Sequence, residues 1–364
     1  MKKIFFVIPT LQGGGAEKVI SNLVLNLDKK KYKISVVVFD LSKQIYLRNK
    51  NINIFHLGNK KITWGIYNFL KVINVNKPDL IISTVSHLNL YVSILKYFFP
   101  KKTKVIVRES NFISQNIYLQ ARSTLFKILY RIFYNNVDCS LVFSKKHKID
   151  ILKNTNIKEH KIKIIGNPIN VNLIQKLSKK KVLTKYKKFL VKKNIIKFIY
   201  VGSLSYQKGL DILINSLAYL NRSKFILNIV GQGSEKRRLK ELVLEKKLNN
   251  NINFLPYLKN PFPLIKNSDV YVMFSRFEGM SNITLEVLAL NKPIIYLNNP
   301  GASTEILKNV NSSFLINSNE PLKIAKKIKM FRSKNTHLSN KKILKKFDIK
   351  EIIKKYESMI DDII

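Results

Sequence analysis

Short, continuously apolar runs alternate with longer stretches of helical pattern along most of this chain. Strands that are apolar at every position are buried on both faces, as in parallel sheets, and each parallel neighbour requires a crossover, usually a helix. The apolar runs of the first half are residues 4–8, 34–39, 80–85, 105–107, 141–143 and 162–165. Residues 16–27 and 123–134 are long enough for crossover helices. The pattern predicts an α/β fold.

A second series of apolar runs follows at residues 198–201, 225–230, 252–255, 270–274 and 293–297. Between the two series, residues 171–194 contain nine lysines and no acidic residue, which is typical of a helical, solvated connector. The 364 residues also exceed the usual size of one core. We predict two Rossmann-like domains, residues 1–167 and 195–348, joined by a Lys-rich connector at 168–194 and followed by a terminal helix at 349–364. Ligands should bind beyond the carboxyl ends of the strands, in an interdomain cleft.

The formal net charge of +44 is compatible with nucleic acid, an anionic membrane surface, acidic substrates or a general bias toward lysine. No helix-turn-helix, zinc or single-strand-binding signature is recognisable, so nucleic acid is the weakest of these hypotheses. The single cysteine, Cys139, excludes an intrachain disulfide and fits a reducing compartment. No segment has the roughly 20 apolar residues of a membrane span. We predict a soluble or peripheral protein.

A glycine-rich motif, Gly13-Gly14-Gly15-Ala16-Glu17, follows the first apolar run and begins the next helix. Glycines let backbone N–H groups approach an anion closely, and the helix N-terminus adds a favourable dipole. A diphosphate fits this chemistry, although a tight turn without a ligand fits it too. Lys18 breaks the GxGxxG pattern, which disfavours a nicotinamide dehydrogenase.

A second motif runs from Ser275 to Asn282 after the run 270–274, and seven residues separate its Glu278 from Glu286. The first carboxylate can lie in the loop while the second lies one to two turns into the following helix. Free N–H groups at that helix start would face an anion. The alternative is that Ser281 caps the helix, Glu286 is solvated and Glu278 is incidental.

Five motifs occur in the order and approximate spacing of glycosyltransferase family 4, and the chain resembles this family over nearly its whole length. They are GGGAE (13–17), VGSLSYQKGLDILI (201–214), VGQGSEKRRL (230–239), SRFEGMSNITLE (275–286) and PGASTE (300–305). The chain is similar to bacterial members that extend lipid-linked or surface oligosaccharides. The resemblance implies a GT-B fold of two facing domains, with the acceptor on the first and the nucleotide-diphosphate sugar on the second. It also implies transfer of a hexosyl or N-acetylhexosaminyl group with retention of configuration.

The resemblance assigns roles to individual residues. Glu278 would be catalytic and contact the donor sugar, Glu286 would accept hydrogen bonds from the ribose, and Lys208 would bind the diphosphate. The other donor-binding residues would be Gly14, Gly15, Ser203, Tyr257, Gly279, Met280, Ser281 and Asn282. Ser203 stands where the family usually has an arginine, and Arg276 is a weak substitute for that cation.

On the acceptor side, many relatives carry a histidine where this chain has Arg108-Glu109-Ser110-Asn111. We predict Glu109, Asn111 and His87 as acceptor-side residues, although a lone histidine is more often structural. The histidines show no metal-ligand spacing and no Asp-x-Asp occurs, so we expect no metal. We expect no cofactor beyond the co-substrate, with UDP favoured over GDP.

Residues 95–102 and 119–134 combine aromatic side chains with lysine and arginine. Such segments suit a membrane interface, and we predict peripheral binding to the inner face of the cytoplasmic membrane. The alternative is that the aromatic side chains belong to the core. Two other functions stay open: a sugar-nucleotide epimerase of the same architecture and a basic nucleic-acid-binding protein.

Overall fold

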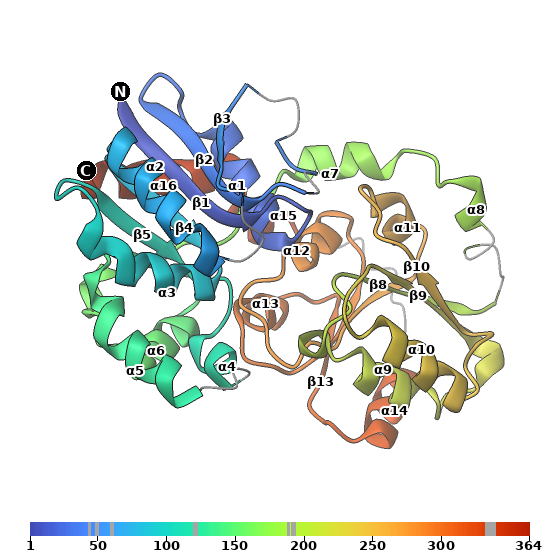
Figure 1. Cartoon of the computed structure of the whole chain (residues 1–364). Coiled ribbons are helices and arrows are strands. Elements are labelled where there is room, and N and C mark those ends of the chain that lie inside the picture. The colour runs from blue at the N-terminus through green and yellow to red at the C-terminus, as the bar shows by residue number, and fades with distance from the viewer. Residues whose placement is uncertain are drawn as a thin grey trace. The chain divides into compact units, whose positions relative to one another are not determined.

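The computed structural model describes residues 1–42, 45–47, 51–58, 62–118, 123–187, 190, 194–331 and 340–364. These residues form two compact units (Figure 1): Met1–Pro168 with Ile349–Ile364, and Ile169–Asp348. Each unit has its own parallel sheet, so the predicted α/β class is confirmed. The connector predicted at residues 168–194 does not stand apart from the second unit, which begins at Ile169. Its first helix, α7 (Val171–Ser178), packs against α11 (Phe262–Lys266) and α12 (Asn282–Ala289) of that unit.

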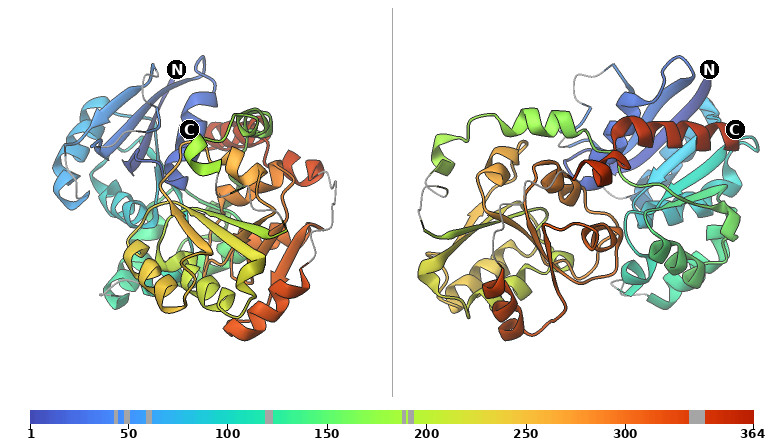
Figure 2. Two further views of the ribbon diagram at one scale, coloured as in Figure 1. Left: turned by 90° about the vertical axis from the view of Figure 1, so that its right-hand side faces the viewer. Right: turned by 180° about the vertical axis from the view of Figure 1, so that it is seen from behind.

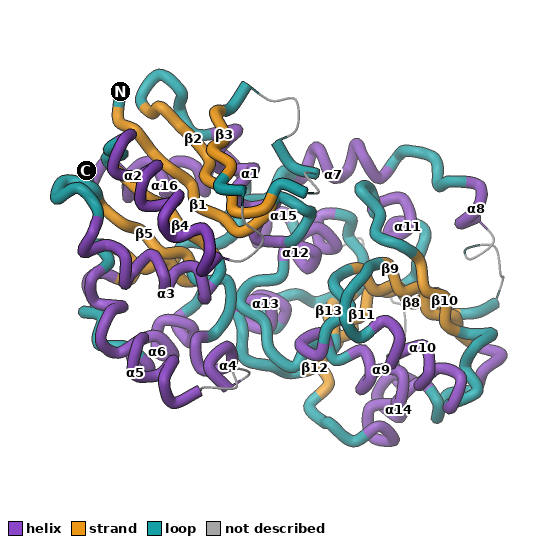
Figure 3. Tube along the Cα trace, in the orientation of Figure 1, coloured by secondary structure: helices purple, strands orange, loops and turns teal. Residues whose placement is uncertain are grey.

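The strands, which Figure 3 draws in orange, form one sheet in the first unit. Its strand order is β3-β2-β1-β4-β5-β6-β7, and all neighbours pair in parallel. The strands are β1 (Lys2–Thr10), β2 (Tyr32–Asp40), β3 (Asn53–His56), β4 (Leu80–Thr84), β5 (Lys104–Arg108), β6 (Cys139–Val142) and β7 (Ile162–Ile164). In β1, Ile4 and Phe6 enter one core while Phe5 and Val7 enter another. Burial on both faces explains the continuous apolar runs.

Helices cover both faces of this sheet. α1 (Gly15–Asn26) and α16 (Ile349–Ile363) pack on one core, and α2 (Ile66–Asn76), α3 (Ser86–Leu95), α5 (Ser123–Phe133) and α6 (Lys145–Asn154) contribute to the other. The remaining helices are α4 (Ile113–Tyr118) and the 3-10 turns η1 (Ile62–Gly65), η2 (Lys96–Phe98), η3 (Tyr134–Asn136) and η4 (Glu159–Lys161).

The predicted terminal helix is α16, which belongs to the first unit although it follows the second in the sequence (Figure 2). Its buried face includes Ile352, Tyr356 and Ile360. The Tyr32 hydroxyl donates to Asp361 Oδ1 at 2.5 Å, which ties the helix to the start of β2. The last helix therefore completes the core of the first unit.

The second unit has the strand order β10-β9-β8-β11-β12-β13, again parallel throughout. Its strands are β8 (Ile196–Val201), β9 (Phe225–Val230), β10 (Ile252–Leu255), β11 (Val270–Met273), β12 (Ile294–Leu297) and β13 (Ser313–Ile316). Its other helices are α8 (Thr184–Lys187), α9 (Leu210–Leu217), α10 (Lys236–Glu245), α13 (Ala302–Leu307), α14 (Pro321–Met330) and α15 (Lys341–Lys345), with the 3-10 turns η5 (Tyr206–Lys208) and η6 (Arg222–Lys224).

Two strands, β3 and β13, were not among the predicted runs. Both lie at sheet edges, and their side chains are mostly partly exposed, so they lack the continuous apolar pattern of a central strand. Among the described residues, no helix combines the length and the apolar character that crossing a membrane requires.

Candidate active site

The carboxyl ends of the neighbouring strands β8 and β11 bring two loops of the second unit together. The loop after β8 ends in η5, and the loop after β11 runs to the start of α12. Gly209, which follows η5, has a φ of +60°, and a Cβ there would collide with the carbonyl oxygen of Phe274. Glycine is therefore needed for this close packing of the loops.

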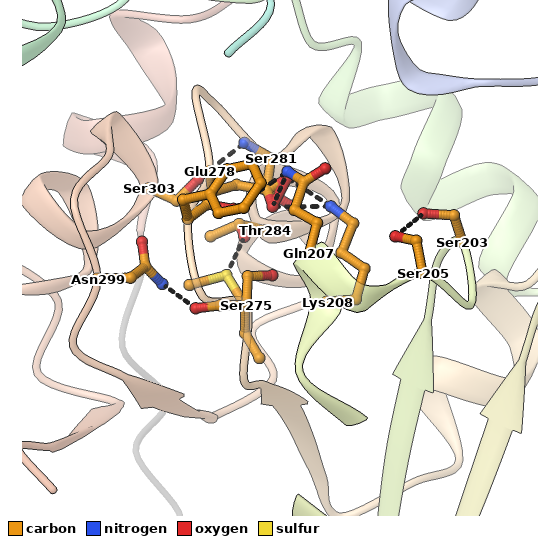
Figure 4. A network of polar contacts seen from close by, with 12 residues as sticks. Ser203, Ser205, Gln207, Lys208, Ser275, Glu278, Ser281, Thr284, Asn299 and Ser303 are labelled. Carbon is orange, nitrogen blue, oxygen red and sulfur yellow. Dashed lines mark hydrogen bonds and ion pairs between the residues drawn. The ribbon is translucent and has the colours of Figure 1, made fainter. Parts of the chain in front are cut away.

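The side chains of Lys208 and Glu278 meet between these loops (Figure 4). Lys208 Nζ lies 2.5 Å from Glu278 Oε1 and 2.7 Å from Oε2, and the exposed side-chain fractions are 18% and 8%. Gln207 Nε2 donates to the carbonyl oxygen of Phe277 at 3.0 Å and lies 3.4 Å from Glu278 Oε2. The structure thus places two of the predicted donor residues in direct contact.

Glu286 lies in α12 and is buried, as is Glu278. Ser281 is the residue before α12, but its side chain makes no capping hydrogen bond. Its N–H donates instead to Ser303 Oγ at 2.8 Å. The alternative of a capping Ser281 and a solvated Glu286 therefore does not describe this loop. Gly279, Met280 and Asn282 belong to the same loop and helix start.

Arg276 forms an ion pair with Asp211, so its charge does not replace that of the arginine absent at position 203. Its guanidinium donates to both Asp211 oxygens at 2.9 and 2.7 Å and to the carbonyl oxygen of Tyr206 at 2.8 Å. It also lies 4.0 Å from the centre of the Tyr206 ring. Burial alone would raise the pKa of Asp211, but the hydrogen bond and charge of Arg276 outweigh it and the pKa is lowered. Arg276 braces η5 against the loop that carries Glu278.

The segment from Asn299 to Thr304 supports the same loop from the other side. Asn299 Nδ2 donates to the carbonyl oxygen of Ser275 at 2.9 Å, and the Ala302 N–H donates to that of Gly279 at 2.8 Å. A Cβ at Gly301 would collide with the carbonyl oxygen of Glu278. The sequence analysis did not predict this supporting role. The Pro300-Gly301 pair, which is typical of a turn, was the feature that could have indicated it.

The other two predicted donor residues of the second unit follow the strands β8 and β10. Ser203 is exposed after β8, with its Oγ 3.5 Å from that of Ser205. Tyr257 follows β10, two strands away from β8 in the sheet, and is 39% exposed. Both lie at the carboxyl edge of the sheet, where parallel sheets bind ligands.

The predicted glycine cradle of the first unit has a carboxylate beside it. Gly14 directly precedes α1, and Gly15 is its first residue. The Glu17 carboxylate accepts a hydrogen bond from Thr10 Oγ1 at 2.8 Å and lies against Gly14, where any Cβ would collide with it. The absence of a side chain at Gly14 thus leaves room for the Glu17 carboxylate in this arrangement.

Glu109 does not fit the predicted contact with an acceptor, because it is fully buried. Its carboxylate accepts hydrogen bonds from Ser86 Oγ at 2.5 Å, from Asn89 Nδ2 at 2.6 Å and from the Tyr134 hydroxyl. Burial raises its pKa, while these hydrogen bonds act in the opposite direction. Glu109 therefore holds the start of α3 against η3, inside the first unit.

His87 and Asn111 lie nearer the surface than Glu109. His87 is exposed in the first turn of α3, directly after Val85 and Ser86. Val85 has a φ of +79°, a rare conformation for a β-branched residue, at the point where β4 ends. The Asn111 carbonyl oxygen lies 3.0 Å from Nε2 of the buried His147. Of the three acceptor-side residues, His87 is the one with an exposed side chain.

In the described part of the chain, no three His, Cys, Asp or Glu side chains are grouped as metal ligands would be. Cys139 is buried in β6, and burial raises the pKa of its thiol to about 12.

The fold is that of the GT-B glycosyltransferases. A crystal structure of Anabaena Alr3699/HepE in complex with UDP-glucose matches with a TM-score of 0.81, covering 100% of both chains at 18% sequence identity. The model of Glycosyltransferase Family 4 matches residues 13–173, and that of Glycosyl transferases group 1 matches residues 181–346. The chain belongs to glycosyltransferase family 4, and it is a glycosyltransferase.

Two curated relatives illustrate the range of the family. An uncharacterized glycosyltransferase of Methanocaldococcus jannaschii, MJ1059, is 30% identical over 260 residues, which cover 68% of this chain and 62% of the relative. A Campylobacter jejuni protein is 24% identical over 367 residues, covering 95% of this chain and 93% of its own length. Its name is N-acetylgalactosamine-N,N'-diacetylbacillosaminyl-diphospho-undecaprenol 4-alpha-N-acetylgalactosaminyltransferase.

Proposed function

We propose that this protein transfers a hexosyl or N-acetylhexosaminyl group from a nucleotide-diphosphate sugar, UDP rather than GDP, to a glycan acceptor with retention of configuration. The observation that carries the proposal is the partly buried Lys208–Glu278 pair at the carboxyl ends of β8 and β11. A cation and a carboxylate held side by side suit a ligand that has both anionic phosphates and sugar hydroxyls.

In this mechanism Lys208 and the N–H groups at the start of α12 stabilise the negative charge that grows on the leaving diphosphate. Glu278 contacts the donor sugar, and Glu286 accepts hydrogen bonds from the ribose hydroxyls. Because Arg276 is held by Asp211, Lys208 carries the side-chain charge that the absent arginine would otherwise share. The reaction proceeds by substitution on one face of the sugar, assisted by the leaving phosphate.

The acceptor proposed here is a lipid-linked glycan, in the assembly of a bacterial surface polysaccharide or glycoconjugate. Support comes from the Campylobacter relative, whose name specifies a diphospho-undecaprenol substrate, and from Escherichia coli relatives named as O-antigen biosynthesis glycosyltransferases. Such an acceptor places the enzyme in the cytoplasm, peripheral on the inner face of the cytoplasmic membrane. Nucleic acid is not a partner in this proposal.

Metal independence and the absence of a further cofactor are also part of the proposal. Lys208 and backbone N–H groups supply the positive charge that Mg²⁺ provides in other phosphate sites. Transfer should therefore continue in excess chelator. Loss of transfer in chelator with recovery on adding a divalent ion would contradict this part.

The test is a panel of UDP- and GDP-sugars offered to the full chain with lipid-linked acceptors, with the products identified by mass spectrometry and the anomeric configuration by NMR. We expect one UDP-sugar to be transferred with retention. Epimerisation of the donor in the absence of any acceptor would favour a sugar-nucleotide epimerase. A product of inverted configuration would exclude the proposed substitution.

A further inference from the structure

Helix α5 is apolar on two faces, and the core of its unit covers only one of them. Its inner face packs on the core through Phe126, Leu129 and Tyr130. On the outer face, Leu125, Ile128 and Ile132 are 45%, 48% and 57% exposed. One apolar stripe is enough to hold a surface helix against its sheet, so the packing of the unit does not explain the outer stripe.

The neighbouring turn η2 adds two exposed aromatic side chains. Tyr97 is 69% exposed and Phe98 is 63% exposed. The Tyr97 ring meets Phe133, the last residue of α5, edge to face with the ring centres 6.4 Å apart. Its hydroxyl donates to Asn136 Oδ1 at 3.2 Å. These contacts place η2 beside the end of α5, where Ile132 is exposed.

The exposed charged side chains on α5 and after η2 are cationic, while Asp138, whose side chain is 21% exposed, pairs with Lys96 of η2 at 2.5 Å. Lys127 and Arg131 of α5 are exposed, as are Lys101 and Lys102 after η2. Between residues 80 and 137 the sequence contains one acidic residue, Glu109, and that residue is buried. We define the docking face as the exposed residues Tyr97, Phe98, Lys101, Lys102, Leu125, Lys127, Ile128, Arg131 and Ile132.

We propose that the docking face binds the surface of an anionic lipid bilayer, with the outer stripe of α5 in the interfacial region. Tyrosine, lysine and arginine are favoured at membrane interfaces, whereas lysine is depleted in protein–protein interfaces. Cations beside an apolar stripe complement anionic lipid. The inference deepens the proposed function, on which it rests, because it places the enzyme at the membrane that holds a lipid-linked acceptor.

The docking face differs in composition from the membrane segments predicted from the sequence. Phe126 and Tyr130, which the sequence made candidates for membrane contact, pack in the core, as the alternative hypothesis held. Leu95 and Phe99 are buried as well. The exposed apolar residues that can enter a bilayer are those of the docking face, such as Ile128 and Ile132. The substitutions that test the proposal are therefore made there.

The experiment measures sedimentation of the full chain with vesicles of phosphatidylcholine, alone or mixed with an equal amount of phosphatidylglycerol. One variant carries Ile128→Gln and Ile132→Gln, and a second carries Lys127→Glu and Arg131→Glu. The matched control carries Leu244→Gln and Leu322→Gln, because these side chains are 65% and 48% exposed on α10 and α14 of the second unit. Urea unfolding of each variant checks that the fold is kept, and UDP binding checks the donor site.

We expect the wild type and the control to bind the mixed vesicles, and each docking-face variant to bind them about tenfold more weakly. Binding by the wild type should weaken as salt rises. Equal binding by all four proteins, or no binding by the wild type, would overturn the docking face. Those results would leave the proposed sugar transfer intact if transfer to a short-chain, water-soluble acceptor persisted. Binding of the docking face to a copurifying protein instead of lipid would also contradict the proposal.

Discussion

Replacing Arg276 with alanine should loosen the loop that carries Glu278 and weaken donor binding. The replacement removes the hydrogen bonds to Asp211 at 2.9 and 2.7 Å and the one to the Tyr206 carbonyl oxygen at 2.8 Å. It leaves Asp211 with Arg238, whose nearest nitrogen is 3.8 Å away. Hydrogen bonds to charged groups contribute about 1.5 to 3 kcal/mol each, and they are not additive, so we expect a net loss of about 2 kcal/mol.

If all of that free energy holds the loop in its binding arrangement, the Kd for UDP rises about 30-fold, since about 1.4 kcal/mol corresponds to one decade. The assay is calorimetric titration of the full chain with UDP, with urea unfolding as the parallel measure of stability. Arg276→Lys keeps the charge but loses the bidentate contact, so its affinity should be intermediate. Arg237→Ala is the matched control, because Arg237 forms an ion pair with Glu241 on α10 and is 92% exposed. An affinity for UDP within twofold of the wild type in Arg276→Ala would refute the bracing role.

Three further predictions concern buried groups. Glu109→Ala should cost about 2 to 4 kcal/mol of unfolding free energy in urea, because the hydrogen-bond donors of Ser86 and Asn89 lose their acceptor. Glu109→Gln, which keeps an acceptor oxygen, should cost less. Burial lowers the pKa of His147 to about 4. The imidazole of His147 therefore binds a proton more tightly in the unfolded chain than in the folded one. Acidification from about pH 6.5 to 4 should remove up to about 3 kcal/mol of the unfolding free energy. The pH profile of His147→Gln should lack this loss. Gly209→Ala should lower both stability and UDP affinity, because its Cβ would collide with the Phe274 carbonyl oxygen; a normal urea midpoint would contradict this.

The central strands could be predicted from the sequence because burial on both faces leaves a signal at every position. Every residue of β4 and β9 is buried, as are Ile4 to Ile8 in the middle of β1, and the apolar runs matched these buried residues closely. The edge strands β3 and β13 carry no such signal, since their residues are mostly partly exposed. Complete burial thus made a strand predictable, but it was not required, because the partly exposed edge strands β7 and β10 were also predicted.

The site was predictable only in part, because spacing along the chain does not show which side chains meet. Lys208 and Glu278 were each predicted to be donor residues, but their direct contact depends on how the loops after β8 and β11 pack at Gly209. Glu109 stood in a loop beside a strand end, and nothing in its neighbours along the chain indicated that Ser86 and Tyr134 would enclose it. Arg276 likewise seemed available as a cation until the structure placed Asp211 against it.

The most direct test of the donor site in the second unit is kcat/KM for sugar transfer by Glu278→Ala and Glu286→Ala, using the donor and acceptor that the panel identifies. Both carboxylates are buried, Glu278 in the loop after β11 and Glu286 in α12. If they contact the donor as proposed, losing one charge-assisted contact in the transition state should cost about 1.5 to 3 kcal/mol, or about one to two decades in rate. Glu241→Ala, whose side chain is 61% exposed on α10, is the matched control and should leave the rate unchanged. Transfer rates near that of the wild type in both variants, with the fold intact, would contradict the donor site described here.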